Sequence, residues 1–231
     1  MSTATISLLS AGAIEPGLVA AVDAYNKRGA GVANITWSTA PVIRRRLDNN
    51  EVHDVVIAPD AAIDDFARQH KVAGDERLYV GRVGIGIVTR VDVVTPDLSN
   101  VDAVEKAVLD AESVVFNRAS SGLHVEALLK NRGISDSIQH KTKRFDDGPA
   151  MMAHLITGKG QEIAFGAIIE ILMFTSKGLK LAAPLPEEIQ HWTRYDAAPM
   201  TAARNAVGAR DFMRYLATPQ VRGLFSAHGI E

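Results

Sequence analysis

Short apolar runs alternate with amphipathic stretches along almost the whole chain. The run over 5–11 has the length and composition of a strand, and apolar residues at helical spacing follow it over 18–25. The alternation continues to the C-terminus, where two helices are expected over 202–217 and 219–228. Alternation of this kind predicts an α/β fold.

Length, charge and cysteine content exclude several kinds of protein and of functional site. A length of 231 residues allows one or two domains. The 25 basic and 27 acidic residues nearly cancel, whereas a nucleic-acid coat needs a basic excess, so no nucleic-acid partner is expected. The chain has no cysteine, which excludes disulfides, thiolate nucleophiles and thiolate metal sites.

Nothing in the sequence predicts membrane insertion. No segment approaches the roughly 20 continuous apolar residues of a membrane span. Met1 leads directly into the first expected strand, without a charged and then apolar leader. The chain as given is therefore expected in the cytoplasm, and in the periplasm if a leader has been removed.

Three expected strand-to-helix junctions share a composition of small and hydroxylated residues. A helix start offers unpaired N–H groups and the positive end of the helix dipole, which bind anions without a metal. Open α/β sheets bind ligands at the carboxyl ends of their strands. A simple helix cap is the rival explanation for any one junction. The candidate ligand residues at the junctions are Ser10, Ala11, Gly12, Ala13, Ser38, Thr39, Ser120, Ser121 and Gly122.

Two arginines and two possible bases complete the candidate site. Arg82 opens an expected strand over 82–90, and Arg118 lies beside the third junction. Either guanidinium can bind a carboxylate, and a surface charge is the alternative. His124 lies in the first turn of its helix, where the dipole favours neutral imidazole and hence a ligand contact or a general base. Glu15 is the second candidate base, with helix capping as its alternative.

The sequence contains no motif of a metal site or of a dinucleotide-binding site. The seven histidines show neither the i,i+4 spacing of a helical metal site nor an HExxH motif, so no metal and no cofactor are expected. Gly84 and Gly86 lie within an expected strand and lack the third glycine and following helix of a dinucleotide fingerprint.

Taken in order, these segments resemble the type II periplasmic-binding-protein fold, and within it the molybdate-binding-protein-like branch of substrate-binding proteins of ABC transporters. The resemblance covers nearly the whole chain. It rests on the ordered series and not on any single motif. The matching segments are Leu9-Ser10-Ala11-Gly12-Ala13-Ile14, Ser38-Thr39, Arg45-Arg46-Leu47-Asp48-Asn49, His53-Asp54-Val55-Val56-Ile57-Ala58, Ser120-Ser121-Gly122-Leu123-His124, Asp211-Phe212-Met213-Arg214-Tyr215-Leu216, Thr218-Pro219 and Phe225-Ser226-Ala227-His228-Gly229.

The resemblance implies two α/β lobes, each a mixed sheet flanked by helices, that bind a small anion in the cleft between them. Lobe 1 is expected to be discontinuous, over 1–83 and 194–231, with lobe 2 over 84–193. A transporter permease is the further partner that this family implies.

The chain departs from the molybdate binders at two hydroxyl positions. Ala13 stands where they carry a serine, and a tyrosine of theirs is replaced near Ala167. An organic polycarboxylate is therefore the favoured ligand. Because the branch includes aconitate-isomerase-like members, an isomerase acting on an unsaturated polycarboxylate is the alternative, with a molybdate or other oxyanion binder as a third.

Overall fold

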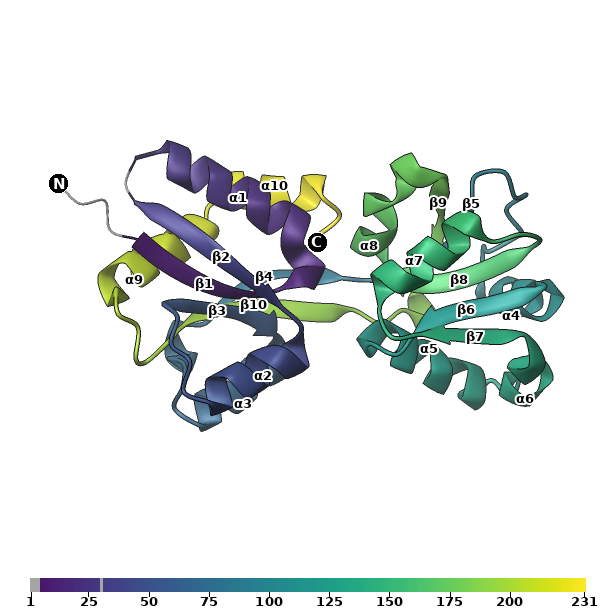
Figure 1. The fold of residues 1–231 in the computed structure, drawn as a ribbon, viewed down its shortest axis with the longest axis horizontal. Helices are drawn as coiled ribbons and strands as arrows, with labels where there is room; N and C mark the ends of the chain where they lie inside the picture. Colours follow the sequence, from purple (N-terminus) through teal and green to yellow (C-terminus); the bar gives the residue numbers. More distant parts are fainter. Residues whose placement is uncertain (1–4, 30) are drawn as a thin grey trace. The chain divides into compact units, whose positions relative to one another are not determined.

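The computed structural model describes residues 5–29 and 31–231, and the chain divides into two units (Figure 1). Unit 1 comprises the chain up to Val83 and again from Thr193, and unit 2 runs from Gly84 to Trp192. The predicted boundary assigns residue 193 to the second lobe. In the structure Thr193 pairs with Val83 and belongs to unit 1.

Unit 1 is built on a mixed five-stranded sheet. Its strands are β1 (Thr5–Ala11), β2 (Val32–Ser38), β3 (Val55–Pro59), β4 (Leu78–Val83) and β10 (Thr193–Pro199). They lie in the order β2-β1-β3-β10-β4. β1 is parallel to β2 and β3, whereas β10 is antiparallel to both of its neighbours.

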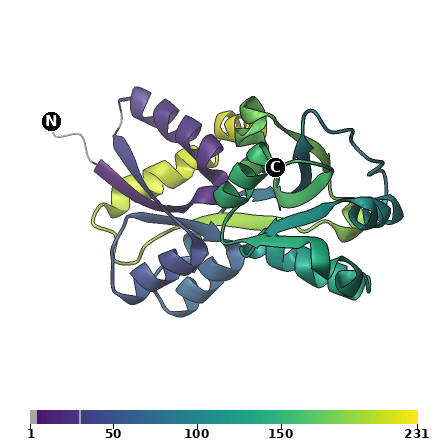
Figure 2. The same ribbon diagram turned by 45° about the vertical axis from the view of Figure 1, so that its right-hand side comes forward.

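Helices cover both faces of the unit 1 sheet (Figures 1 and 2). They are α1 (Glu15–Lys27), α2 (Ala40–Asp48), α3 (Asp60–Arg68), α9 (Ala206–Leu216) and α10 (Pro219–Ala227). The C-terminal helices pack with α1: the Tyr25 ring meets Phe212 edge-on at 5.1 Å, and the Tyr215 hydroxyl donates to the Ala21 carbonyl at 2.9 Å.

Unit 2 repeats this architecture with its own sheet, in the order β7-β6-β8-β5-β9. Its strands are β5 (Ile85–Arg90), β6 (Ser113–Asn117), β7 (Thr142–Phe145), β8 (Glu162–Ala167) and β9 (Leu179–Pro184). Its helices are α4 (Val101–Asp110), α5 (Ser120–Asn131), α6 (Ser135–Ile138), α7 (Gly148–Thr157) and α8 (Ile168–Met173). Strands β6, β7 and β8 are parallel, and β5 runs against β8 and β9.

The unit 2 sheet buries both of its faces. Val114 and Phe116 belong to one core cluster with residues of α4, α5 and α6, while Val115 packs with Met151 and Leu155 of α7 in another. Burial on both sides explains why β6 is an unbroken apolar run. The predicted α/β class, with mixed sheets flanked by helices, is confirmed.

The single strand predicted over 82–90 is wrong. The structure has two strands, β4 and β5, with Gly84 between them, and they belong to different units. A Cβ built on Gly84 would lie 2.9 Å from the Trp192 ring, and one on Gly86 would lie 2.5 Å from Leu181. Close packing therefore accounts for both glycines.

The helix predicted over 202–217 begins four residues later, at Ala206. Asn205 precedes it and caps it, because its Oδ1 accepts from the Gly208 N–H at 2.9 Å. In the part of the chain that the structure describes, none of the helices has the length and apolarity needed to cross a bilayer.

Candidate functional site

The predicted ligand loops lie at two sheet edges. In unit 1 the carboxyl ends of β1, β2 and β3 lead into α1, α2 and α3, and we call this the unit 1 edge. In unit 2 the carboxyl ends of β6, β7 and β8 lead into α5, α7 and α8, which we call the unit 2 edge. Both are places where open α/β sheets bind ligands.

The first two predicted loops meet at the unit 1 edge. Ala11, the last residue of β1, is the register partner of Ser38, the last residue of β2. Gly12 and Ala13 follow Ala11 in a short 3₁₀ turn that leads into α1. Gly12 is exposed, and a Cβ built on it would meet nothing within 4 Å. The backbone at Gly12 is therefore open to a small molecule.

Hydroxyl groups at the unit 1 edge differ in availability. Ser10 is fully buried and its Oγ donates to the Ala11 carbonyl at 3.2 Å, so this hydroxyl is already engaged. Ser38 is half-buried, and Thr39 is exposed at the N-cap of α2, where its side chain makes no capping hydrogen bond. Capping thus does not explain Thr39, which remains a candidate donor.

Glu15 lies in the first turn of α1, directly before Pro16. An acidic side chain at this position interacts favourably with the helix dipole. Its side chain is half-buried, and the structure supports the capping explanation as well as it supports a base.

The third predicted loop, at the unit 2 edge, is held by a residue that the predicted site does not include. The Asn117 side chain accepts from the N–H groups of Ala119 at 3.0 Å and Gly122 at 3.3 Å. This leaves the first N–H groups of α5, those of Ser120 and Ser121, without an intrahelical partner. An asparagine two to five residues before a helix is a known turn and cap signal, so the sequence contained the clue.

Gly122 is required by the close approach of α5 to the end of β6. A Cβ at Gly122 would lie 1.8 Å from the Asn117 carbonyl oxygen. Ser120 is exposed and Ser121 is buried beside it. The glycine therefore allows the helix start and its hydroxyls to reach the unit 2 edge.

The two predicted arginines are both paired. Arg82 lies in β4, where its guanidinium meets the Glu231 carboxylate at 2.9 Å and its backbone pairs with that of Glu231. Arg118 is exposed, with its Nε 3.4 Å from Asp146. Each pair is on the surface, where ion pairs contribute little free energy.

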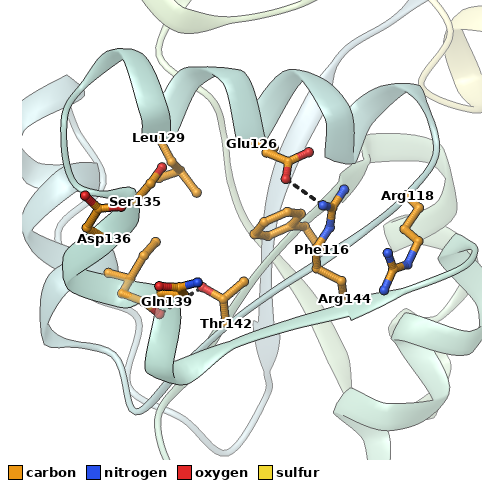
Figure 3. Close-up of a pocket in the computed structure, with 10 residues that line it drawn as sticks. Phe116, Arg118, Glu126, Leu129, Ser135, Asp136, Gln139, Thr142 and Arg144 are labelled. Atoms are coloured by element: carbon orange, nitrogen blue, oxygen red, sulfur yellow. Dashed lines mark hydrogen bonds and ion pairs between the residues drawn. The ribbon is translucent and has the colours of Figure 1, made fainter.

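Arg118 also lines a cavity of about 490 Å³ in unit 2 (Figure 3). A second arginine, Arg144, lies in this cavity with its guanidinium over the Phe116 ring and an ion pair to Glu126 at 2.6 Å. The Nε of Arg144 is buried and has no hydrogen-bond partner among the described residues. Glu126 and Asp136 balance the two arginines, so the cavity lining carries no net charge.

His124 faces the segment that ends unit 2. Its Nε2 lies 3.3 Å from the Ile189 carbonyl, and its ring stacks on His191 with centroids 4.6 Å apart. Burial lowers the pKa of His191, and the nearby His124 lowers it further. His124 is thus partnered by backbone and by a second imidazole.

A second residue absent from the predicted site is Glu170, in the first turn of α8 at the unit 2 edge. Its carboxylate lies against the start of α7, since a Cβ built on Gly148 would be 2.2 Å from Glu170 Oε2. That oxygen is buried and has no hydrogen-bond partner among the described residues. Burial raises the pKa of Glu170, and the nearby Asp147 carboxylate raises it further.

The two edges offer hydroxyl and backbone N–H donors. In residues 5–29 and 31–231, no three His, Asp or Glu side chains come together in a way that could hold a metal ion. What these donors can do chemically is bind an anion by hydrogen bonds and helix starts.

Several known proteins resemble this chain in sequence or in fold. A curated relative, aconitate isomerase from Pseudomonas sp., is 25% identical over 98% of this chain and 87% of its own length. The periplasmic molybdate-binding protein of Azotobacter vinelandii superposes with a TM-score of 0.76, at 13% identity and 98% of each chain. The sulfate-binding protein of Mycobacterium tuberculosis H37Rv superposes with a TM-score of 0.72, at 15% identity, over 98% of this chain and 86% of its own.

These likenesses confirm the predicted two-lobed binding-protein fold. A family model described as bacterial extracellular solute-binding protein matches residues 6–231. The chain belongs to the family of bacterial extracellular solute-binding proteins.

Proposed function

We propose that this protein binds a small organic polycarboxylate through hydroxyl and backbone N–H donors at the starts of helices. The observation that carries the proposal is a pair of hydroxyl-lined helix starts. Thr39 at the start of α2 makes no side-chain capping hydrogen bond, and the N–H groups of Ser120 and Ser121 at the start of α5 have no intrahelical partner. Such starts bind carboxylate oxygens through N–H and O–H groups.

Two observations favour a carboxylate over a tetrahedral oxyanion. Ala13 and Ala167 carry no hydroxyl where the resemblance to molybdate binders leads one to expect serine and tyrosine, and the Ser10 hydroxyl is engaged by Ala11. The curated relative is named for aconitate, a tricarboxylate. A tricarboxylate presents several separate anionic groups, and each of them can accept hydrogen bonds from donors of this kind.

Removing single hydroxyl donors tests this proposal. Thr39→Ala and Ser120→Ala should each weaken binding of tricarballylate, a saturated tricarboxylate, by about 10- to 150-fold, because a hydrogen bond to a charged group is worth roughly 1.5–3 kcal/mol. Isothermal titration calorimetry measures this and should keep a stoichiometry of one ligand per chain. Ser137→Ala, on an exposed serine of α6, is the matched control. Unchanged affinity in both donor variants would contradict the site.

A second function, isomerisation of an unsaturated polycarboxylate, is favoured by the aconitate isomerase relative. A base would take a proton from the methylene carbon and return it to the other end of the allylic system, moving the double bond. His124 and Glu15 are the predicted bases. Proton NMR of cis-aconitate with the protein should then show the trans isomer, and His124→Ala should abolish it. If the wild-type protein converts no cis-aconitate, the isomerase function is wrong and the binding function stands.

Location and partner follow the family description. The matching family is described as extracellular and solute-binding, and such proteins work outside the cytoplasm. Of the two expected locations, the periplasm is therefore favoured over the cytoplasm. A transporter permease is the partner consistent with that role.

A further inference from the structure

Glu170 is an unusual residue at the unit 2 edge because its carboxyl group has no partner. It is the one acidic residue in the apolar stretch Ile168-Ile169-Glu170-Ile171-Leu172. Its neighbours Ile169 and Ile171 are buried in the fold. No hydrogen bond or ion pair holds its side chain among the described residues, and an unpaired buried carboxylate is costly.

The carboxyl group is placed where α7 begins. Gly148, the first residue of α7, has no side chain, and the Glu170 carboxyl occupies the space that a Cβ would need. Asp147 caps α7, since its Oδ1 accepts from the Ala150 N–H at 2.8 Å. Glu170 therefore lies at the same edge as the Ser120 and Ser121 donors, since α5, α7 and α8 all follow parallel strands.

Among residues 5–29 and 31–231, no cation forms an ion pair with Glu170. The charged group that acts on it is Asp147, which is itself acidic. The charged residues of the neighbouring elements either have other partners or lie at the ends of their strands that are far from Glu170. At the near end, the first residue of β5, Ile85, is the register partner of the last residue of β8, Ala167. These charged residues are Arg90 and Glu162, which pair with each other, His154 and Lys143, which pair with Glu162, Lys180, which donates to the Val93 carbonyl, and Lys177, which lies over the Phe174 ring.

We propose that Glu170 binds the ligand as a neutral carboxylic acid and donates its proton in a hydrogen bond to a ligand carboxylate. The inference rests on the proposed polycarboxylate function. An ionised Glu170 would repel the ligand, so a protein molecule in which Glu170 is ionised must take up one proton from solvent when it binds. Ligand binding is thereby linked to proton uptake.

The sign of the pH dependence follows. Burial and Asp147 both raise the pKa of Glu170, so the neutral acid persists above the ordinary carboxyl range. As the pH rises through this raised pKa, the fraction of free protein with a neutral Glu170 falls. Affinity should therefore fall by up to tenfold per pH unit above it.

Calorimetry with tricarballylate between pH 6.5 and 8.5 tests the inference, because its carboxyl groups are then essentially ionised. Titrations in two buffers of different ionisation enthalpy report proton uptake. Wild-type binding should weaken as the pH rises, and its proton uptake should grow with pH. Glu170→Gln keeps an N–H donor of similar size, so its affinity should be nearly independent of pH and its proton uptake close to zero.

The outcomes separate the two proposals. Glu188→Gln, on an exposed glutamate, should behave as wild type. If wild type and Glu170→Gln bind tricarballylate with the same pH profile and the same proton uptake, the role of Glu170 is wrong and polycarboxylate binding stands. If wild type binds no carboxylate at any pH in the range, both proposals fall.

Discussion

Gly122→Ala should reduce polycarboxylate affinity by at least about 100-fold. The new Cβ would lie 1.8 Å from the Asn117 carbonyl oxygen, a backbone atom that cannot move without the end of β6, and 2.7 Å from the Asn117 Oδ1. The start of α5 must shift away, and the N–H and hydroxyl donors of Ser120 and Ser121 shift with it. A misplacement of about 1 Å is enough to lose hydrogen bonds of this kind.

Overpacking of this kind also destabilises a fold, typically by about 1–3 kcal/mol, so folding and binding must be measured separately. Chemical denaturation gives the free energy of unfolding, and calorimetry on the folded variant gives the affinity. Gly223→Ala is the matched control, because a Cβ there meets nothing within 4 Å and the residue lies in α10. Wild-type affinity in Gly122→Ala would show that the start of α5 does not bind the ligand.

Glu162→Ala should lower the free energy of unfolding by about 3–5 kcal/mol, the cost of removing one partner from a buried ion pair. Glu162 is buried at the opposite end of β8 from the unit 2 edge. It accepts from Arg90 at 3.0 Å, from Lys143 and Ser113 at 2.9 Å and from His154 at 3.1 Å. Arg90 is itself only 9% exposed, so the substitution leaves a buried guanidinium whose remaining carboxylate partner is the exposed Asp92, 3.5 Å from its Nε.

The loss should depend on pH in a defined direction. Burial acts to raise the pKa of Glu162, but hydrogen bonds from Lys143, Ser113 and His154 outweigh it and hold this pKa below its ordinary value. The stabilisation is therefore complete above the ordinary carboxyl pKa and is lost as the pH falls through the lowered one. Urea unfolding at pH 7 and at pH 3 measures it, with Glu188→Ala as control. An equal deficit at both pH values would contradict the ionic origin.

Local pattern was enough to predict the α/β class, because apolar strands and amphipathic helices differ in period. The break at Gly84 could not be predicted, since its two neighbours, Val83 and Ile85, are both apolar and the residue that packs on Gly84, Trp192, lies far along the chain. Strand β10 was missed for a similar reason. It contains Asp196, fully buried in a central strand and paired with Arg77 from another part of the chain.

The candidate site could likewise be predicted only where it depends on local sequence. Small and hydroxylated residues at strand ends were visible in the sequence, and the structure places them at the two sheet edges. The sequence did not show which hydroxyl groups are available to a ligand. Ser10 is buried and its hydroxyl donates to the Ala11 carbonyl, whereas Thr39 is exposed. Glu170 was hidden in an apolar run, and its environment depends on Gly148, more than twenty residues earlier.

The most direct test of the central claim is a calorimetric comparison of tricarballylate and trans-aconitate with molybdate and sulfate at pH 6.5. The account predicts saturable binding of a tricarboxylate at one site per chain, and a raised unfolding temperature at saturating ligand. It predicts no comparable binding of either oxyanion. Tight binding of molybdate or sulfate, with none of either carboxylate, would contradict it.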